Sequence, residues 1–145
     1  MDGTQQIGTF YNDKFCGWNT LLDKDGVIFI GLFNNDLLSV KGLSYNSDKD
    51  CVYKGTFKNL MKEGYGEEFL NGYKYKGEFK GDKKNGKGKM IFKNGDVYDG
   101  EFEDDKINGF GRFKWSNKNK EYQGYFVNGK INGNGILKWG DDMIS

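Results

Sequence analysis

The stretch Tyr98-Asp-Gly-Glu-Phe102, followed by Gly109-Phe-Gly111, carries the pattern that decides the fold of this chain. An aromatic residue, a glycine and a Phe alternate with polar residues, and a pair of glycines begins seven residues after the Phe. A period of two places the rings and the glycine on one face of a β-strand and the polar residues on the other. The pattern therefore predicts a strand with one buried face and one solvated face, as in an antiparallel sheet.

The same pattern occurs in four successive segments of the chain. The pentads begin at residues 53, 75, 98 and 122, so that their spacings are 22, 23 and 24 residues. The glycine pairs that follow them are Gly64/Gly66, Gly86/Gly88, Gly109/Gly111 and Gly133/Gly135. Two degenerate copies precede them, Gln6-Ile-Gly-Thr-Phe10 and Phe29-Ile-Gly-Leu-Phe33. A fixed period near 23 residues predicts a repeat architecture, here one domain over residues 1–145. The repeats expected are 6–28, 29–52, 53–74, 75–97, 98–121 and 122–145.

Tyr-x-Gly-x-Phe followed by Gly-x-Gly, at this period, resembles the MORN repeat (membrane occupation and recognition nexus). The resemblance implies one β-hairpin per repeat, with successive hairpins paired side by side. It therefore implies an all-β fold, an elongated single-layer antiparallel sheet of about six stacked hairpins. Members of the family usually carry Gly three residues after the Phe, where this chain has Leu60, Asp82, Asp105 and Gly129. Because Asp tolerates turn conformations, the hairpins are expected to survive the change.

The composition agrees with a sheet protein. The chain of 145 residues contains 23 Gly, 12 Phe, 9 Tyr and 3 Trp, with no Pro, His or Ala. Strong helix formers other than Lys, Glu and Leu are scarce, and the many aromatic residues favour short strands. The 22 basic and 21 acidic residues give no reason to expect nucleic-acid binding. No apolar run approaches the ~20 residues needed to cross a bilayer, and no secretory signal is seen. We expect a cytoplasmic protein, with cytoskeletal or membrane association left open.

Nothing in the sequence indicates catalysis. No Gly-x-Ser-x-Gly, phosphate loop or metal-ligand cluster is present, and Glu67-Glu68 and Asp104-Asp105 are neighbours whose side chains point to opposite faces of a strand. Cys16 and Cys51 are too few for a disulfide framework, and without His they indicate no zinc site, so free thiols are expected. The sequence predicts a non-enzymatic protein with no cofactor and no metal.

The aromatic residues are expected to form one continuous face. A glycine inside a strand costs about 0.5–1 kcal/mol relative to Ala, so its retention between two rings needs a steric reason. We expect the bare backbone to receive a ring from the neighbouring repeat. The second strand of each clear repeat adds an apolar residue six positions after the first glycine of the pair, namely Leu70, Phe92, Trp115 and Trp139.

This aromatic face is the predicted partner site. A single-layer sheet cannot cover both of its faces, and a contiguous aromatic stripe exceeds what monomers usually expose. A helix or an extended peptide from a protein partner is therefore expected along it, as the resemblance also implies. The residues predicted to bind the partner are Phe29, Phe33, Tyr53, Phe57, Tyr75, Phe79, Tyr98, Phe102, Tyr122, Phe126, Trp115 and Trp139.

A second hypothesis places an anionic phospholipid surface on the lysines between Lys74 and Lys93. Six acidic residues between Asp96 and Asp105 would weaken this attraction, so a solvated surface is favoured. The candidate lipid-binding residues are Lys80, Lys83, Lys84, Lys87 and Lys89. A third hypothesis is a purely structural subunit of a larger assembly.

The ends of the sheet raise further expectations. Unpaired edges at the Gln6–Phe10 and Ile136–Trp139 strands attract strands of another chain, which predicts a homodimer or a larger assembly. Repeat two is apolar on both faces, which indicates either a contact surface or a locally thicker core. The residues concerned are Cys16, Leu21, Leu22, Ile28, Ile30, Leu32, Leu37 and Leu38.

Overall fold

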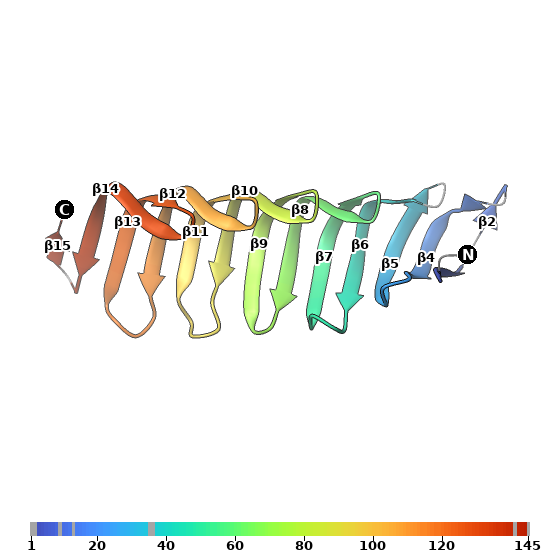
Figure 1. The fold of residues 1–145 in the computed structure, drawn as a ribbon, viewed down its shortest axis with the longest axis horizontal. Coiled ribbons are helices and arrows are strands. Elements are labelled where there is room, and N and C mark those ends of the chain that lie inside the picture. The colour runs from blue at the N-terminus through green and yellow to red at the C-terminus, as the bar shows by residue number, and fades with distance from the viewer. Residues whose placement is uncertain (1–2, 9, 13, 35–36, 141, 145) are drawn as a thin grey trace.

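The computed structural model describes residues 3–8, 10–12, 14–34, 37–140 and 142–144, which form an elongated row of strands (Figure 1). Thirteen strands of this part of the chain join into one sheet, and β2 and β3 form a separate pair. Apart from β1 with β4, each strand of the sheet pairs antiparallel with its neighbour in sequence, so the two chain ends lie at opposite ends of the row (Figure 1). The predicted all-β sheet of stacked hairpins is confirmed. The strands are β1 (Gln5–Ile7), β2 (Phe10–Tyr11), β3 (Lys14–Phe15), β4 (Gly17–Leu22), β5 (Val27–Asn34), β6 (Leu37–Asn46), β7 (Cys51–Lys58), β8 (Met61–Leu70), β9 (Tyr73–Lys80), β10 (Lys83–Ile91), β11 (Val97–Glu103), β12 (Lys106–Trp115), β13 (Lys120–Val127), β14 (Lys130–Trp139) and β15 (Asp142–Ile144).

Two-residue turns close the hairpins of the four clear repeats. Both turn residues have positive φ, as the favoured hairpin turn requires. Asp82 and Asp105, which replace the usual Gly, have φ of 69° and 68°, so the expectation that Asp preserves the turn is confirmed. Their carboxylates also accept the backbone N–H of Lys62 (2.7 Å) and Lys84 (2.8 Å) in the preceding repeat. Glycine at these two positions could not make this bond between repeats.

A bulge bends every clear hairpin at the same place. After the pair Gly55–Gly66, the register moves to Phe57–Lys62, so that Thr56 lies opposite three residues. The middle one, Gly64, has a φ of +81°, and Gly86, Gly109 and Gly133 repeat this conformation. We call the face that carries the Tyr and Phe rings the inner face, and the opposite one the outer face. The hairpin end curls over the inner face (Figure 1), which brings the Lys62 ammonium into contact with the Glu68 carboxylate.

In the clear repeats, the tyrosine that begins each pentad lies on the glycine pair of its own hairpin. A Cβ atom on Gly66 would lie 2.4 Å from the Tyr53 ring, and one on Gly55 would lie 2.6 Å from the Cα of Gly66. The Tyr53 hydroxyl donates a hydrogen bond to the Thr56 carbonyl at 2.8 Å, and Tyr75 and Tyr98 repeat this geometry. The expectation that the ring comes from the neighbouring repeat is wrong, because the tyrosine leans along its own strand toward the bulge.

Phenylalanine connects one repeat to the next. The Tyr53 ring meets Phe57 of its own hairpin at a centroid distance of 4.9 Å and Phe79 of the next repeat at 5.0 Å, both edge to face. The same contacts continue from Tyr75 to Phe102 at 5.0 Å and from Tyr98 to Phe126 at 5.2 Å. Edge-to-face pairs add about 0.5–1.5 kcal/mol each beyond area burial. The core is therefore a single chain of rings along the sheet, which we call the ring ladder.

The two ends of the sheet differ from each other. At the N-terminal end, β1 (Gln5–Ile7) is the edge strand and overlaps the first part of the predicted Gln6–Phe10 strand. At the other end, Leu137 pairs with Ile144 and Trp139 with Asp142, so β15 covers part of β14. The prediction that the Ile136–Trp139 strand is an edge is therefore wrong for its last three residues.

Substituting one of the paired glycines on which the tyrosine rings lie should disrupt the ring ladder locally. In Gly77→Val or Gly100→Val the new Cβ would meet the Cα of the paired glycine at 2.4 or 2.5 Å, where only backbone movement gives relief. We expect a loss of about 3 kcal/mol, at the upper end for overpacked cores, in urea unfolding followed by circular dichroism. The control Lys76→Val changes an exposed residue of the same strand and should stay within about 0.5 kcal/mol. Equal stability of all three variants would contradict the ladder.

The buried tyrosines should make the fold sensitive to alkali. Burial raises the pKa of Tyr53 and Tyr98 to about 12, and that of Tyr75 further. The pKa of each of these tyrosines is higher in the folded state than its unfolded value of 10.0. Their contribution to stability is therefore complete below pH 10 and falls as the pH rises toward 12. Each tyrosine contributes up to about 1.4 kcal/mol per pH unit to this slope. Tyr98→Phe should therefore unfold with a shallower pH dependence; an unchanged slope would place Tyr98 outside the core.

Candidate functional site: the inner face

The ten Tyr and Phe residues predicted to bind a partner are buried inside the ring ladder. Their exposed fractions are 6% or less, so their surface is occupied by contacts within the chain. The two predicted tryptophans behave differently: Trp115 is half-buried and Trp139 is 53% exposed. Surface for a partner on the inner face is therefore found beside the ladder.

A second line of apolar side chains runs along the inner face next to the ladder. Leu70, Phe92, Trp115 and Trp139 occupy the same position in four consecutive repeats, and we call these four residues the inner row. Figure 1 shows the second strands that lead to them, β8, β10, β12 and β14, at regular intervals along the molecule. The inner row thus offers one apolar group per repeat.

Two further rings fill the spaces of the inner row. Tyr73 meets Phe92 at 5.7 Å, and Phe113 lies 5.7 Å from Phe92 and 4.8 Å from Trp115. Tyr73 is 40% exposed, whereas Phe113 is half-buried. Neither ring is among the residues predicted from the sequence. The alternation of side chains between the two faces of a strand would have indicated both, since Tyr73 lies two residues before Tyr75 and Phe113 two residues after Gly111.

The Lys120 ammonium lies between the two tryptophans of the row. It is 4.5 Å from the centroid of the Trp115 ring and 5.2 Å from that of Trp139. Cation–π contacts of this kind contribute about 0.5–1 kcal/mol at exposed sites. Lys120 therefore contacts two indoles that belong to adjacent repeats.

A buried group of charges lies on the inner face of repeats three and four. Glu68 is 5% exposed, contacts the Lys62 ammonium, and lies 3.2 Å from that of Lys84. Burial opposes the charge of Glu68, but the two ammonium groups outweigh it, so the pKa of this carboxyl is lowered. The pKa of Lys62 is raised, because Glu68 outweighs the effect of burial. The sequence does not indicate that Glu68 is buried. A bulge brings its lysine partners to it, and the spacing of residues does not reveal this bulge.

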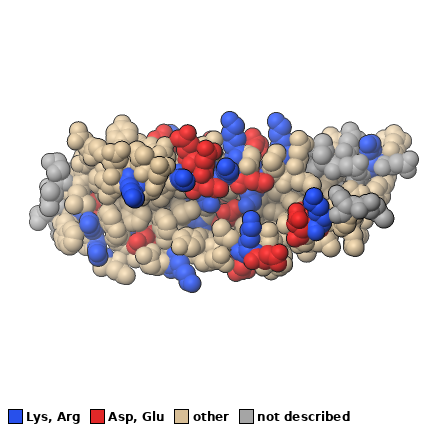
Figure 2. All heavy atoms as spheres, in the orientation of Figure 1, with Lys and Arg blue, Asp and Glu red and all other residues tan. Residues whose placement is uncertain are grey.

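Lys84 lies apart from the other four candidate lipid-binding lysines, which are exposed. Lys84 points inward with its side chain 11% exposed, so it belongs to the buried charge group. Lys80 and Lys83 face each other across a hairpin end, whereas Lys87 pairs across strands with Glu101 and Lys89 with Asp99. Figure 2 shows basic and acidic side chains interspersed along the visible face. In the described part of the chain, no helix is long and apolar enough to span a membrane.

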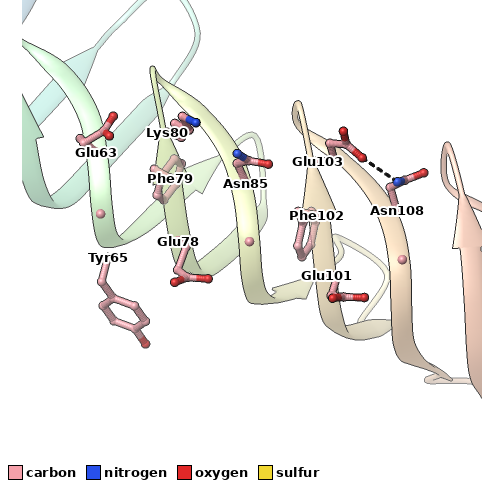
Figure 3. Close-up of a pocket in the computed structure, with 13 residues that line it drawn as sticks. Glu63, Tyr65, Glu78, Phe79, Lys80, Asn85, Glu101, Phe102, Glu103 and Asn108 are labelled. Carbon is pink, nitrogen blue, oxygen red and sulfur yellow. Dashed lines mark hydrogen bonds between the residues drawn. The ribbon is translucent and has the colours of Figure 1, made fainter.

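A broad hollow of about 800 Å³ crosses the bulges of repeats three to five. Figure 3 shows Glu63, Glu78, Glu101 and Glu103 along it. These carboxylates accept hydrogen bonds from the chain itself: Glu78 from the Lys87 N–H at 2.6 Å, and Glu103 from the Asn108 amide at 2.8 Å (Figure 3). Glu78 and Glu101 satisfy backbone N–H groups of the bulges, whereas Glu63 accepts the Gly81 N–H of a hairpin turn. Among the described residues, no group of His, Cys, Asp or Glu could hold a metal ion.

The outer face of the first repeats is apolar. Trp18, Ile30 and Leu32 are 69%, 43% and 36% exposed, while Leu21 is 2% exposed and joins the core. Leu21 thus confirms the expected addition to the core, while the contact surface on the outer face stays a prediction. Leu37 and Leu38 belong to β6 rather than to a hairpin loop, and their side chains lie outside the described part of the structure.

The two cysteines are free, as expected. Cys51 is buried, which raises the pKa of its thiol and keeps it unreactive, while Cys16 is half-buried.

Comparisons with known proteins agree with this geometry. The MORN repeat family model matches residues 53–72, 75–97, 98–120 and 122–143, which together are more than half of the chain. The chain belongs to the MORN-repeat family. No curated protein has significant sequence similarity to it. Among solved structures, it is similar to the TCP domain of SAS-4 (dCPAP) of Drosophila melanogaster, in complex with a proline-rich motif of Ana2 (dSTIL). The TM-score is 0.53 at 10% sequence identity, over 89% of this chain and 72% of that one.

Removing the charge of Glu68 should destabilise the fold. Glu68→Gln leaves two ammonium groups facing each other, and breaking a buried pair in this way costs about 3 kcal/mol. Because the folded pKa of Glu68 is lowered, its contribution is complete above its ordinary value of 4.5 and is lost as the pH falls below it. The difference between wild type and variant in urea unfolding should thus be constant from pH 6 to pH 8 and shrink in acid. A difference independent of pH would exclude an electrostatic origin.

Proposed function

We propose that this protein is a non-enzymatic, protein-binding repeat scaffold, and that a partner segment lies along the inner row. The observation that carries the proposal is the row itself, an apolar side chain at one position in four consecutive repeats, of which Leu70, Phe92 and Trp115 are partly buried and Trp139 is exposed. Tryptophan and tyrosine are the residue types that most often dominate binding energy at interfaces. Trp139 and Tyr73, which are 53% and 40% exposed, are therefore the expected anchors.

The structural neighbour supports a partner of this kind. Its sheet resembles that of this chain, and it is seen in complex with a proline-rich motif of another protein. Such a partner is a short segment of chain rather than a folded domain. A narrow row beside a buried ladder suits a segment of this width, because the curled hairpin ends border the inner face on one side.

Selection from a random peptide library tests the proposal. Peptides are selected on the full chain and then measured by fluorescence anisotropy against Trp139→Ala, Tyr73→Ala and the matched control Trp18→Ala, which removes an exposed indole from the outer face. We expect Trp139→Ala and Tyr73→Ala to weaken the selected peptides at least tenfold and Trp18→Ala to have little effect. Equal binding to all three variants, with unchanged melting temperatures, would move the site away from the inner row and favour a purely structural subunit.

We also propose that the β1 edge takes part in assembly. All three residues of β1 are exposed, and Ile7 is 71% exposed on this edge strand. Unpaired edge strands recruit a second chain. Light scattering after size exclusion should show a dimer or larger species that Ile7→Lys shifts toward the monomer. A monomer at high concentration would contradict this part of the proposal.

A further inference from the structure

We propose that the segment bound on the inner row is a polyproline II helix with an apolar or proline residue at every third position, lying along the long axis of the sheet. The inference rests on the proposed function and adds the conformation and sequence period of the ligand. It comes from the spacing of the inner row compared with the spacing of the three regular conformations that a peptide can adopt.

The inner row has a pitch of one repeat, which is two strands. The row lies at the end of the second strand of successive hairpins, with one first strand between each two. Leu70, Trp115 and Trp139 are the last residues of β8, β12 and β14, and Phe92 directly follows β10. Neighbouring strands lie about 4.7–4.9 Å apart, so the row presents an apolar group about every 9.6 Å. Lys120, on the strand between β12 and β14, pairs with Trp115 on one side and with Trp139 on the other, so the two indoles lie two strands apart.

A polyproline II helix matches this pitch. It rises about 3.1 Å per residue with three residues per turn, so residues i and i+3 lie on one face about 9.3 Å apart. The mismatch is about 0.3 Å per repeat, or about 1 Å over the four positions of the row. A segment of about ten residues therefore reaches all four positions with residues i, i+3, i+6 and i+9.

The other regular conformations fit less well. An α-helix returns to the same face after seven residues, a rise of about 10.5 Å, which drifts by nearly 1 Å per repeat and 3 Å over the row. A β-strand presents one face every second residue, about 6.7 Å apart, so its contacts coincide with the row only irregularly. The pitch therefore selects a period of three residues.

The chemistry of the row also suits such a ligand. Polyproline II segments dock in grooves lined by aromatic residues, where their preformed conformation limits the entropy lost on binding. Their backbone carbonyls have no internal hydrogen bonds, and the indole N–H of Trp139 and the hydroxyl of Tyr73 are donors of the kind that such carbonyls accept. The Lys120 ammonium contacts both indoles across the strand between them.

Synthetic peptides test the period. Three labelled, uncharged peptides of equal length are titrated against the full chain: one with proline at every third position, one of the same composition with no two prolines three residues apart, and one helical, alanine-rich peptide with leucines at i, i+3 and i+7. We expect the first to bind at least tenfold more tightly than the other two. Trp139→Ala should reduce its affinity at least tenfold, and the outer-face control Trp18→Ala should leave it within twofold.

The outcomes separate this inference from the proposed function. If library peptides depend on Trp139 but lack the three-residue period, or if the scrambled or helical peptide binds as well as the first, the period is wrong and the site stands. If the first peptide binds equally to wild type and to Trp139→Ala, both the period and the site are wrong. Stepwise weakening when prolines are removed one at a time from the first peptide would support one contact per repeat.

Discussion

The contact between a tyrosine ring and two bare glycine backbones is the constraint on which this structure depends. With Gly55 and Gly66 paired at the same level, the two strands leave a flat area as long as the Tyr53 side chain, and the ring lies on it. The hydroxyl then reaches the carbonyl at the bulge. The contacts of this one tyrosine thus require the paired register of the two glycines, the absence of their side chains and the position of the bulge. This explains why all three features recur together in every clear repeat.

This arrangement also determines where function can lie. Because the ladder uses its rings inside the chain, the residues that define the repeat leave almost no surface for binding. Two other sets of positions remain free to vary on the inner face. At the position beside Tyr53 and Tyr75 the chain has Glu68 and Met90, of which Glu68 anchors a buried charge group. At the next position outward it has the inner row, where the aromatic residues accumulate toward the C-terminus.

The sequence alone predicts the fold, the six hairpins and the inner position of the rings, because these follow from a period of two inside a period near 23. It does not predict which ring covers which glycine, since spacing gives the face of a side chain but not its direction along the strand. It also does not predict that Lys62 reaches Glu68. At the bulge, three residues of one strand lie opposite one residue of the other, and the resulting bend brings together two side chains that would lie apart on a straight strand. The position of Lys84 was missed for the same reason.

In a repeat sheet, the distance between repeats sets a length scale for the contacts that a ligand can make. In a compact domain the spacing of surface groups follows from irregular packing, whereas here it is fixed by the hydrogen-bond distance between strands, multiplied by two. Each repeat contacts only its neighbours, so the stability of the sheet is approximately a sum of local contributions. A ligand whose own period matches that scale gains with every added repeat, while a mismatched one gains only until it falls out of step. In the proposed complex, the backbone of the sheet therefore selects the conformation of the partner, and the side chains of the row decide how strongly the partner is held.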